Sequence, residues 1–415
     1  MGDRPYFITW QDQEKAHTVS IEKAVGNFLI TNEGKRLFDF SSTSYHAIFG
    51  NSHPEVVKAM MNQAKLISVS NPKSIFKLKE EVSYMLLKAL KKRDGKLFYT
   101  VSGAESVENA LKMARQRSGK KIILAREQSY HGATLGALSI TGDWRNKKHD
   151  TIDEWTARIP EPHDDPKLIK TKKIIKSIGP HKIAAFCLET ITGGNGVIIP
   201  PKSWFEGIQK ICDQYKIQLI LDEVVCGFHR TGKPFGFHHY KLRPDYICMA
   251  KGINAGHCPF GAVWVSKSAS EDLEKEVFSY GLTNYAHPLG LASTKKVLQI
   301  LEREKLQTHL KQLQKSFKKH LDTLKKNPFV KEVRQIGLLA AIETNGREDL
   351  FDDFKESGLF VSQVRENIIL CPSYITSLKQ VEKYISKIDQ VILKKYSLDK
   401  EKQNDKNISV KRRSS

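Results

Sequence analysis

The amino-acid sequence predicts an α/β fold built on a mostly parallel sheet with helices on both faces. Between residues 96 and 266, short apolar runs alternate with segments whose apolar residues recur at helical spacing. Parallel strands that are buried on both faces have this continuous apolar character. Two charged residues follow neighbouring runs, Asp222 after 217–221 and Lys251 after 246–250. Ligands of such sheets bind beyond the carboxyl ends of the strands, so we expect a binding site there.

The composition is that of a globular protein with an excess of positive charge. The chain has 415 residues, of which 40% are hydrophobic and 27% are charged, enough for a large core and more than one domain. A net charge of +21 raises the possibility of a nucleic-acid partner. The lysines are spread along the chain, however, and alternate with acidic residues, which favours solvated helix faces. Only residues 411–413 form a concentrated basic run, so we expect no nucleic-acid partner.

Cysteine usage and hydropathy indicate a cytoplasmic protein without a membrane partner. None of the cysteines forms a CxxC pair and several lie inside apolar runs, which suits reduced thiols. No apolar segment of a signal peptide follows the first residues, and no run of 18 apolar residues is long enough for a transmembrane helix. The cysteines are Cys187, Cys212, Cys226, Cys248, Cys258 and Cys371.

The N-terminal part predicts a hairpin followed by two helices. Strands are expected at 24–30 and 36–40, around an Asn/Gly turn. A loop rich in hydroxyl groups follows, and His53-Pro54-Glu55 then opens a helix with proline in its first turn. A second amphipathic helix is expected at 74–90.

The middle of the chain predicts strands that alternate with helices. The strand 96–101 leads through a Ser-Gly-Ala turn into a helix, and the strand 122–125 leads to Tyr130-His131-Gly132. Further elements are expected at 107–117, 183–189, 204–215 and 261–266. We expect the large domain to span 51–290.

The C-terminal part predicts a long helix and a smaller α+β unit. One apolar stripe predicts a helix over 291–327, and strands are expected near 330–334, 338–343 and 367–370. Residues 1–50 and 291–395 are expected to form the smaller domain. The polar residues 396–415 are expected to be a disordered basic tail.

Four groups of residues near strand ends have the chemistry of a cofactor site. The turn at Ser102 offers free N–H groups and the positive end of a helix, which suits a phosphate, although an ordinary helix cap has the same sequence. Tyr130 can cover a flat heteroaromatic ring or can be a core aromatic. His131 has no second ligand at metal spacing, so we expect no metal. Asp222 can hold a pyridine nitrogen protonated or can cap a helix. Lys251, if buried, has a lowered pKa and a free lone pair for Schiff-base formation.

The order of these groups identifies a family resemblance. The matching segments are Ser102-Gly-Ala-Glu-Ser-Val-Glu-Asn-Ala110, Tyr130-His-Gly132, Leu221-Asp-Glu-Val224, Ala250-Lys-Gly252, Gly227–Phe237, Arg243-Pro-Asp245, Thr283–Leu289 and Val333–Leu338. The chain resembles the class III aminotransferases, fold type I enzymes that depend on pyridoxal 5′-phosphate. The resemblance covers about residues 25 to 390. It implies a large cofactor-binding domain with a seven-stranded sheet and a smaller α+β domain.

The resemblance also implies roles for individual residues. Lys251 would form the Schiff base and move the proton, and Asp222 would pair with the pyridine nitrogen. Tyr130 and Val224 would cover the two ring faces, and Thr283 would reach the phosphate of a neighbouring subunit in a homodimer. The residues implied to bind the cofactor are Ser102, Gly103, Ala104, Tyr130, His131, Glu189, Asp222, Val224, Lys251 and Thr283.

The implied activity is a ping-pong transamination from an ω- or β-amino acid or amine to a 2-oxo acid such as pyruvate. Thr190 replaces a proline and Gly194 replaces a glutamate that gates a substrate-binding arginine in some members. This departure resembles the branch that uses taurine, β-alanine and related donors. Phe7, Trp10 and Tyr45 are candidates for the substrate pocket or for simple packing.

Three alternatives are left open by the sequence. A racemase or aminomutase of the same fold would share the cofactor residues and differ in where the proton returns. A basic nucleic-acid-binding protein without catalysis would not need the pair Asp222 and Lys251. A nicotinamide dehydrogenase would need a Gly-rich fingerprint that the sequence lacks.

Overall fold

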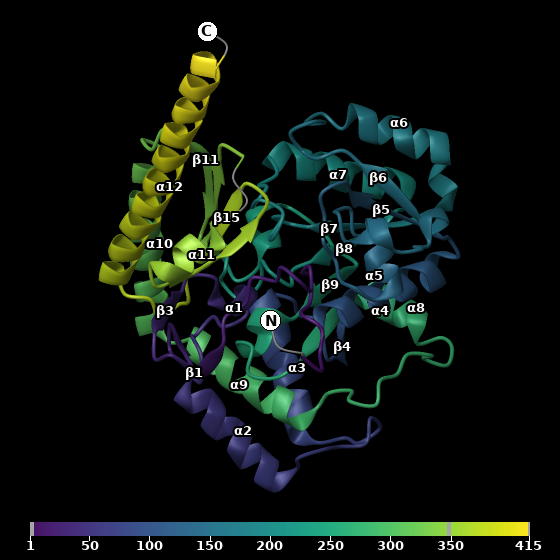
Figure 1. Ribbon diagram of the computed structural model, residues 1–415. Helices are drawn as coiled ribbons and strands as arrows, with labels where there is room; N and C mark the ends of the chain where they lie inside the picture. Colours follow the sequence, from purple (N-terminus) through teal and green to yellow (C-terminus); the bar gives the residue numbers. More distant parts are fainter. Residues whose placement is uncertain (1–3, 347–349, 414–415) are drawn as a thin grey trace.

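The structure, a computed structural model, describes residues 4–346 and 350–413 and is centred on one large sheet (Figure 1). The sheet has seven strands in the order β4-β10-β9-β8-β7-β5-β6. Neighbouring strands from β9 to β6 run parallel, whereas β10 is antiparallel to both β9 and β4. The prediction of a mostly parallel seven-stranded sheet is therefore confirmed. The strands are β4 (Lys96–Thr100), β5 (Ile122–Arg126), β6 (Thr156–Ile159), β7 (Ile183–Glu189), β8 (Gln218–Asp222), β9 (Tyr246–Met249) and β10 (Gly261–Val265).

Both faces of this sheet are buried, as the apolar runs predict. Along β7, Phe186 and Leu188 belong to one hydrophobic cluster, while Ala185 and Cys187 belong to a second cluster on the other face. Successive strand residues point to opposite faces, so a strand with core on both sides must be apolar throughout. The helices that follow the early strands are α2 (Pro54–Leu66), α3 (Lys77–Leu90), α4 (Gly103–Ser118), α5 (Leu135–Ile140), α6 (Ile169–Ile178), α7 (Lys202–Tyr215) and α8 (Lys267–Leu273).

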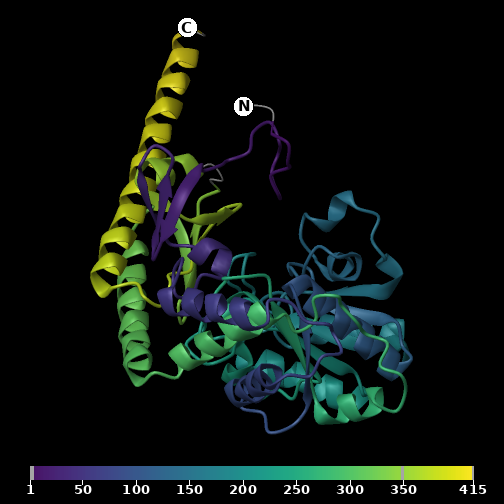
Figure 2. The same cartoon turned by 90° about the horizontal axis from the view of Figure 1, so that it is seen from below.

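Two four-stranded sheets form the smaller part of the molecule. One has the order β1-β2-β3-β13 and the other β11-β12-β15-β14. Because β13 pairs with β3 in parallel, the beginning and the end of the chain share one sheet, and Figure 2 shows them side by side. The strands are β1 (Ile21–Val25), β2 (Phe28–Thr31), β3 (Arg36–Asp39), β11 (Val330–Ile336), β12 (Leu339–Thr344), β13 (Leu359–Phe360), β14 (Ser362–Val364) and β15 (Asn367–Leu370). The exact domain boundaries stay a prediction.

The long helix expected at 291–327 is two helices. Helix α9 (Pro288–Leu301) ends before α10 (Glu304–Leu324) begins, and Arg303 between them has an extended backbone with φ −66° and ψ 126°. The Arg303 guanidinium donates two hydrogen bonds, of 2.7 and 2.6 Å, to the Glu55 carboxylate on α2. This contact stabilises the break between α9 and α10. The sequence has no glycine or proline at the break that would predict it.

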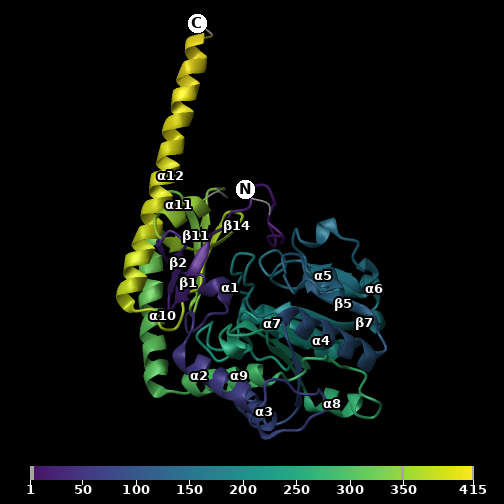
Figure 3. The same ribbon diagram turned by 60° about the horizontal axis from the view of Figure 1, so that its bottom comes forward.

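Residues 396–413, which were expected to belong to a disordered tail, are helical, and residues 414–415 lie outside the described residues. Helix α12 (Leu378–Arg413) continues through residues 396–413 and projects from the body of the molecule (Figure 3). The sequence of α12 contains no glycine or proline and is rich in lysine. The part of α12 that packs on the protein provides the helix nucleus. Each following residue then adds one helical hydrogen bond without a new nucleation step, so the helix continues beyond the packed part. The remaining helices are α1 (Ser42–Tyr45) and α11 (Phe351–Glu356).

Within residues 4–346 and 350–413, no helix has both the length and the apolar character needed to cross a membrane.

Candidate active site

Lys251 lies directly after the carboxyl end of β9. It begins a 3₁₀ turn, Lys251–Asn254, with a left-handed backbone conformation of φ 45°. Its Nζ atom is 4.8 Å from the centre of the Tyr45 ring. Burial lowers the pKa of Lys251 below its usual value, while the negative charges of Asp222 and Glu189 act in the opposite direction. A lysine with a lowered pKa carries a free lone pair more often, which is what a nucleophile and proton carrier needs.

Asp222 is the last residue of β8 and is held from two sides. Its Oδ2 atom is 2.9 Å from His131 Nδ1, and its Oδ1 atom accepts a 3.0 Å hydrogen bond from the Val224 N–H. The other ring nitrogen of His131, Nε2, is buried without a hydrogen-bond partner in the described chain. The structure therefore brings His131, Asp222 and Val224 together, as the sequence predicts.

The turn between β4 and α4 combines a helix cap with a cradle for an anion. The Ser102 hydroxyl accepts a 3.1 Å hydrogen bond from Glu105 N, and the Glu105 carboxylate accepts one of 2.9 Å from Val101 N. The Ser102 hydroxyl caps the start of α4, so the interpretation of this turn as an ordinary helix cap is also correct. No hydrogen bond within the described chain satisfies the N–H groups of Gly103 and Ala104, which are free for a phosphate.

Two glycines keep this cradle open. A Cβ atom on Gly103 would lie only 3.0 Å from both methyl groups of Val224, so the phosphate turn packs against the expected ring-facing valine. Gly132 has φ 134°, and a Cβ atom there would lie 2.6 Å from the Ala104 side chain. The turn after β5 and the turn after β4 are therefore in contact, which places Tyr130 beside the same cradle.

Glu189 and Arg126 form a buried charged layer behind Tyr130. Glu189 ends β7, in register with Asp222 on β8, and accepts a 3.3 Å hydrogen bond from Tyr130 N. Arg126 is completely buried, donates to Glu161 at 3.2 Å, and lies 3.7 Å from the Glu189 carboxylate. Burial raises the pKa of Glu189 to about 7, with Arg126 and His131 opposing this rise. Arg126 and Glu161 are not among the predicted site residues, although an arginine that ends an apolar run is the same signal as Lys251.

A cluster of aromatic rings around Arg145 forms the mouth of the site. The Arg145 guanidinium carbon is 4.7 Å from the Tyr130 ring, 5.0 Å from Trp144 and 5.2 Å from Trp10. Asp143 pairs with one end of the guanidinium group, and the buried Nε atom has no hydrogen-bond partner in the described chain. Of the two roles predicted for Trp10, substrate pocket or simple packing, the structure favours the pocket. Arg145 and Trp144 were not predicted.

Tyr45 reaches the site through an unusual turn. Ser42, Thr43, Ser44 and Tyr45 all have left-handed φ values, between 45° and 76°. Each such residue costs about 1–2 kcal/mol. Asp39 offsets this cost, because its carboxylate accepts hydrogen bonds from the backbone and hydroxyl groups of Ser41 and Thr43. The turn places Tyr45 against Lys251, and a Cβ atom on Gly194 would lie 3.5 Å from the Tyr45 hydroxyl oxygen.

Two predicted residues lie apart from this group. Phe7 is 90% exposed and does not line the site. Thr283 is exposed on the segment before α9, and the structure records no hydrogen bond between it and the described site residues. Thr190, the replacement for proline, donates a 2.9 Å hydrogen bond to the fully buried Glu223, next to Asp222. This bond gives the departure from the family pattern a local structural reason.

The geometry fits pyridoxal 5′-phosphate. The free N–H groups of Gly103 and Ala104 suit its phosphate, and the fixed carboxylate of Asp222 suits its ring nitrogen. Lys251 supplies the amine for its aldehyde. The individual contacts of these residues with the cofactor stay predictions.

Comparisons with known proteins agree with this fit. A family model described as aminotransferase class-III matches residues 9–392. The mitochondrial gamma-aminobutyrate transaminase 1 of Oryza sativa subsp. japonica is 28% identical, over 92% of this chain and 82% of its own. The gamma aminobutyrate transaminase 3 of Solanum lycopersicum, a chloroplastic protein, is 27% identical over 94% of this chain and 83% of its own.

Solved structures show the same similarity in three dimensions. The taurine:2-oxoglutarate aminotransferase of Bifidobacterium kashiwanohense, in complex with PLP and glutamate, has 29% identity and a TM-score of 0.88, covering 93% of this chain and 94% of that one. The PMP-bound aminotransferase of Vibrio fluvialis has 25% identity and a TM-score of 0.90, covering 95% and 97%. The chain belongs to the class-III aminotransferases and is a transaminase that works with pyridoxal 5′-phosphate.

Proposed function

We propose that this enzyme takes its amino group from an ω-amino acid whose far end is a carboxylate or sulfonate, and transfers it to a 2-oxo acid such as pyruvate. The observation that carries the proposal is Arg145, a cation held at the mouth of the site with an unpartnered, buried Nε atom. An anionic group at the far end of the donor supplies the missing acceptor. The relatives named for γ-aminobutyrate and taurine use donors of this shape.

The rings of Tyr130, Trp144 and Trp10 hold the Arg145 guanidinium group at the mouth of the site. Tyr130 is shared between the mouth and the inner site, because Arg145 stacks on its ring while its backbone N–H bonds to Glu189. A donor that places its acid on Arg145 therefore extends along Tyr130 toward Lys251. Asp143 pairs with one end of the Arg145 guanidinium group and leaves Nε without a partner, so the acid of the donor and the acid of the 2-oxo acid use this cation in turn.

The inner residues then carry the proton and hold the reacting groups. Bound pyridoxal phosphate supplies the electron sink for the carbon that loses its proton. Lys251 Nζ, with its lowered pKa, removes that proton and returns it on the other side of the transferred nitrogen. Asp222 would pair with the ring nitrogen, and His131 fixes the orientation of the Asp222 carboxylate. The 2-oxo acid runs the same steps in reverse.

We also propose that the active form is a homodimer in the cytoplasm. Exposed apolar side chains gather on α2, on the segment that leads to α3, and on the segment after α8, which lie on one side of the molecule (Figures 1 and 3). They include Met61, Leu66, Val69, Ile75, Val277 and Phe278. A second copy would cover this apolar face, and Thr283 on it would meet the neighbouring site. The six unpaired cysteines support a reducing compartment.

The test compares acidic and neutral donors in the first half-reaction. With donor alone, β-alanine or taurine should remove the visible absorption of the lysine-bound cofactor, which a racemase would keep. Arg145→Gln should raise the KM for β-alanine and taurine by roughly 30- to 100-fold and leave 1-phenylethylamine almost unchanged. Lys147→Gln, which removes a nearby exposed charge, is the control. Equal losses for all three donors in Arg145→Gln would contradict the proposal.

A further inference from the structure

Apart from the site residues, the structure has a cavity lined by Phe228, whose side chain packs on Gly252, the residue after Lys251; it is called the cavity behind Lys251. Its volume is about 460 Å³, and it lies between the C-terminal ends of α3 and α9 and the segment 228–235. Pockets of about 300–1,000 Å³ are typical of small-molecule sites. None of the residues that line this cavity belongs to the site around Asp222 and Arg145.

The floor of the cavity is aromatic and is connected to Lys251. Phe228 and Phe235 are fully buried, with ring centres 5.1 Å apart. The other side of Phe228 packs on Gly252, where a Cβ atom would lie 3.1 Å from the Phe228 side chain. The Tyr374 hydroxyl donates a 2.5 Å hydrogen bond to the Phe228 carbonyl oxygen, so this residue is held from behind as well. An apolar group in the cavity would contact Phe228, which in turn packs on Gly252, the residue that follows Lys251.

The upper part of the cavity offers polar groups that have no partner. Within the part of the chain that the structure describes, the His229 backbone N–H bonds to the Pro234 carbonyl oxygen, and no hydrogen bond is recorded for the His229 ring. Burial and the nearby charge of Lys91 lower the pKa of His229 to about 4, so its ring is neutral at pH 7 and can donate one hydrogen bond. Lys88 pairs with Glu302 at 2.7 Å, whereas no ion pair is recorded for Lys91 among the described residues. The rim therefore has one unmatched positive charge.

The backbone at this place is strained. Phe228 and His229 are consecutive residues with left-handed φ values of 57° and 72°. Such conformations are unfavourable for residues with side chains, and they persist in folded proteins mainly where a functional site requires them. His229 lines the cavity, while the preceding residue, Phe228, packs on Gly252.

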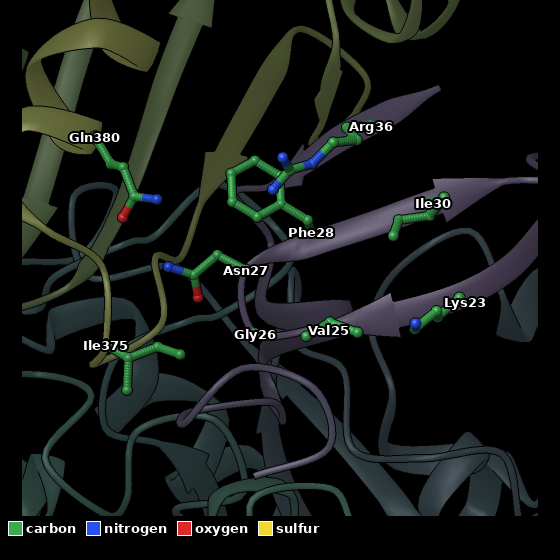
Figure 4. Close-up of a pocket in the computed structure, with 9 residues that line it drawn as sticks. All are labelled: Lys23, Val25, Gly26, Asn27, Phe28, Ile30, Arg36, Ile375 and Gln380. Carbon is green, nitrogen blue, oxygen red and sulfur yellow. The ribbon is translucent and has the colours of Figure 1, made fainter. Parts of the chain in front are cut away.

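A hollow beside the N-terminal sheet offers a comparison with the cavity behind Lys251. This hollow, of about 500 Å³ beside the β1-β2-β3 sheet, is lined by Phe28 and Arg36, among others, with the Arg36 guanidinium group over the Phe28 ring. Figure 4 shows the residues that line it. Its buried amide, Asn27, already donates to Thr376 at 3.2 Å and accepts from the Ser373 hydroxyl. The buried amide of this hollow is therefore satisfied, and the hollow, which also carries the exposed Lys23, serves as the control surface.

We propose that the cavity behind Lys251 binds a small monocarboxylate with an apolar body, such as an arylalkanoic acid. The apolar body lies over Phe228 and Phe235, and the carboxylate accepts a hydrogen bond from His229 and faces Lys91. This site is separate from the donor site and does not depend on the identity of the donor.

The test uses 4-phenylbutyrate as the probe with the complete holoenzyme. Calorimetric titration should show saturable binding of one probe per subunit, and a saturating concentration of taurine should not displace it. The neutral amide of the probe should bind at least about tenfold more weakly. Equal affinity for the acid and the amide, or displacement by taurine, would overturn the proposal.

Variants locate the binding. Lys91→Glu, at an exposed position that does not threaten the fold, should weaken binding about tenfold or more, and Ala89→Trp should fill the cavity and abolish binding. Lys23→Glu, which makes the same charge change at the hollow in Figure 4, should have no effect. Retained cofactor absorption verifies that each variant is folded. Unchanged affinity in Lys91→Glu would show that the probe binds somewhere else.

Discussion

The inner site and its mouth are built in different ways. Lys251, Asp222 and Glu189 all come from the carboxyl ends of adjacent strands of one sheet, and their side chains are held by buried partners. Arg145 and Trp10 come from irregular segments and are held mainly by ring stacking. The comparison teaches that the sheet positions the groups that do chemistry, while loops position the groups that choose the substrate. Changes in the inner site should therefore affect all donors equally.

Lys251→Ala should have the largest effect, because it removes both the amine that anchors the cofactor and the base that moves the proton. We expect turnover to fall by at least about 10⁴-fold with acidic and neutral donors alike. Steady-state rates with β-alanine and 1-phenylethylamine measure this. A variant that loses only the acidic donor would break the distinction between the inner site and the mouth.

Asp222→Asn should have the next largest effect. The amide keeps the shape of the side chain but removes the charge beside the ring nitrogen and changes the bond to His131. We expect the rate of the first half-reaction to fall by about 10²–10³-fold, again for every donor, while the cofactor stays bound. Stopped-flow absorbance measures the rate, and the visible spectrum measures occupancy. An unchanged rate would mean that another residue serves the ring nitrogen.

Glu189→Gln should change the pH dependence more than the maximal rate. The negative charge of Glu189 raises the pKa of Lys251, so removing it should lower that pKa further. The acidic limb of the profile of kcat/KM against pH should therefore move to lower pH. Because the pKa of Glu189 is raised to about 7, the folded protein also holds a proton that the unfolded chain releases. This group thus lowers the free energy of unfolding as the pH rises from about 4.5 to 7, and the variant should lose that dependence.

Thr190→Val should have the smallest effect. It removes the 2.9 Å hydrogen bond to Glu223 and leaves a buried carboxylate with two backbone donors, Gly236 N and Phe237 N. We expect the free energy of unfolding to fall by about 1–3 kcal/mol with little change in donor preference. Denaturant unfolding of the holoenzyme measures the loss. A changed preference among donors would place Thr190 in the mouth rather than in the supporting layer.

The inner site was predictable from the sequence because its residues carry two coincident signals. Asp222 and Lys251 are charges at the ends of buried apolar runs, and parallel strands bring such ends to one edge of the sheet. The cap at Ser102 has a local sequence signature as well. The same logic applied to Arg126 would have found the buried charged layer.

The mouth was predictable only in part, at Trp10 and Tyr130, because its contacts join segments far apart in the sequence. Arg145 lies in a polar stretch that looks like any solvated loop, and only the folded chain places Trp10 and Tyr130 around it. The left-handed turn that positions Tyr45 has no glycine to announce it, since Asp39 supplies the stabilising hydrogen bonds. The break at Arg303 and the helical extension of α12 likewise depend on contacts and continuity that a local pattern does not contain.

The sheet shared by β3 and β13 constrains the order in which the protein folds during synthesis. Asn27 and Thr376, which are hydrogen-bonded beside that sheet, are separated by 349 positions along the chain. A ribosome adding about 5–20 residues per second would need roughly half a minute to make the segment between them. During that time the N-terminal strands have no partner on one edge, although the central sheet can already assemble. Ribosome-bound chains should therefore gain cofactor-site geometry before the terminal sheet closes, and the closing step should be slow because it joins the two most distant parts of the sequence.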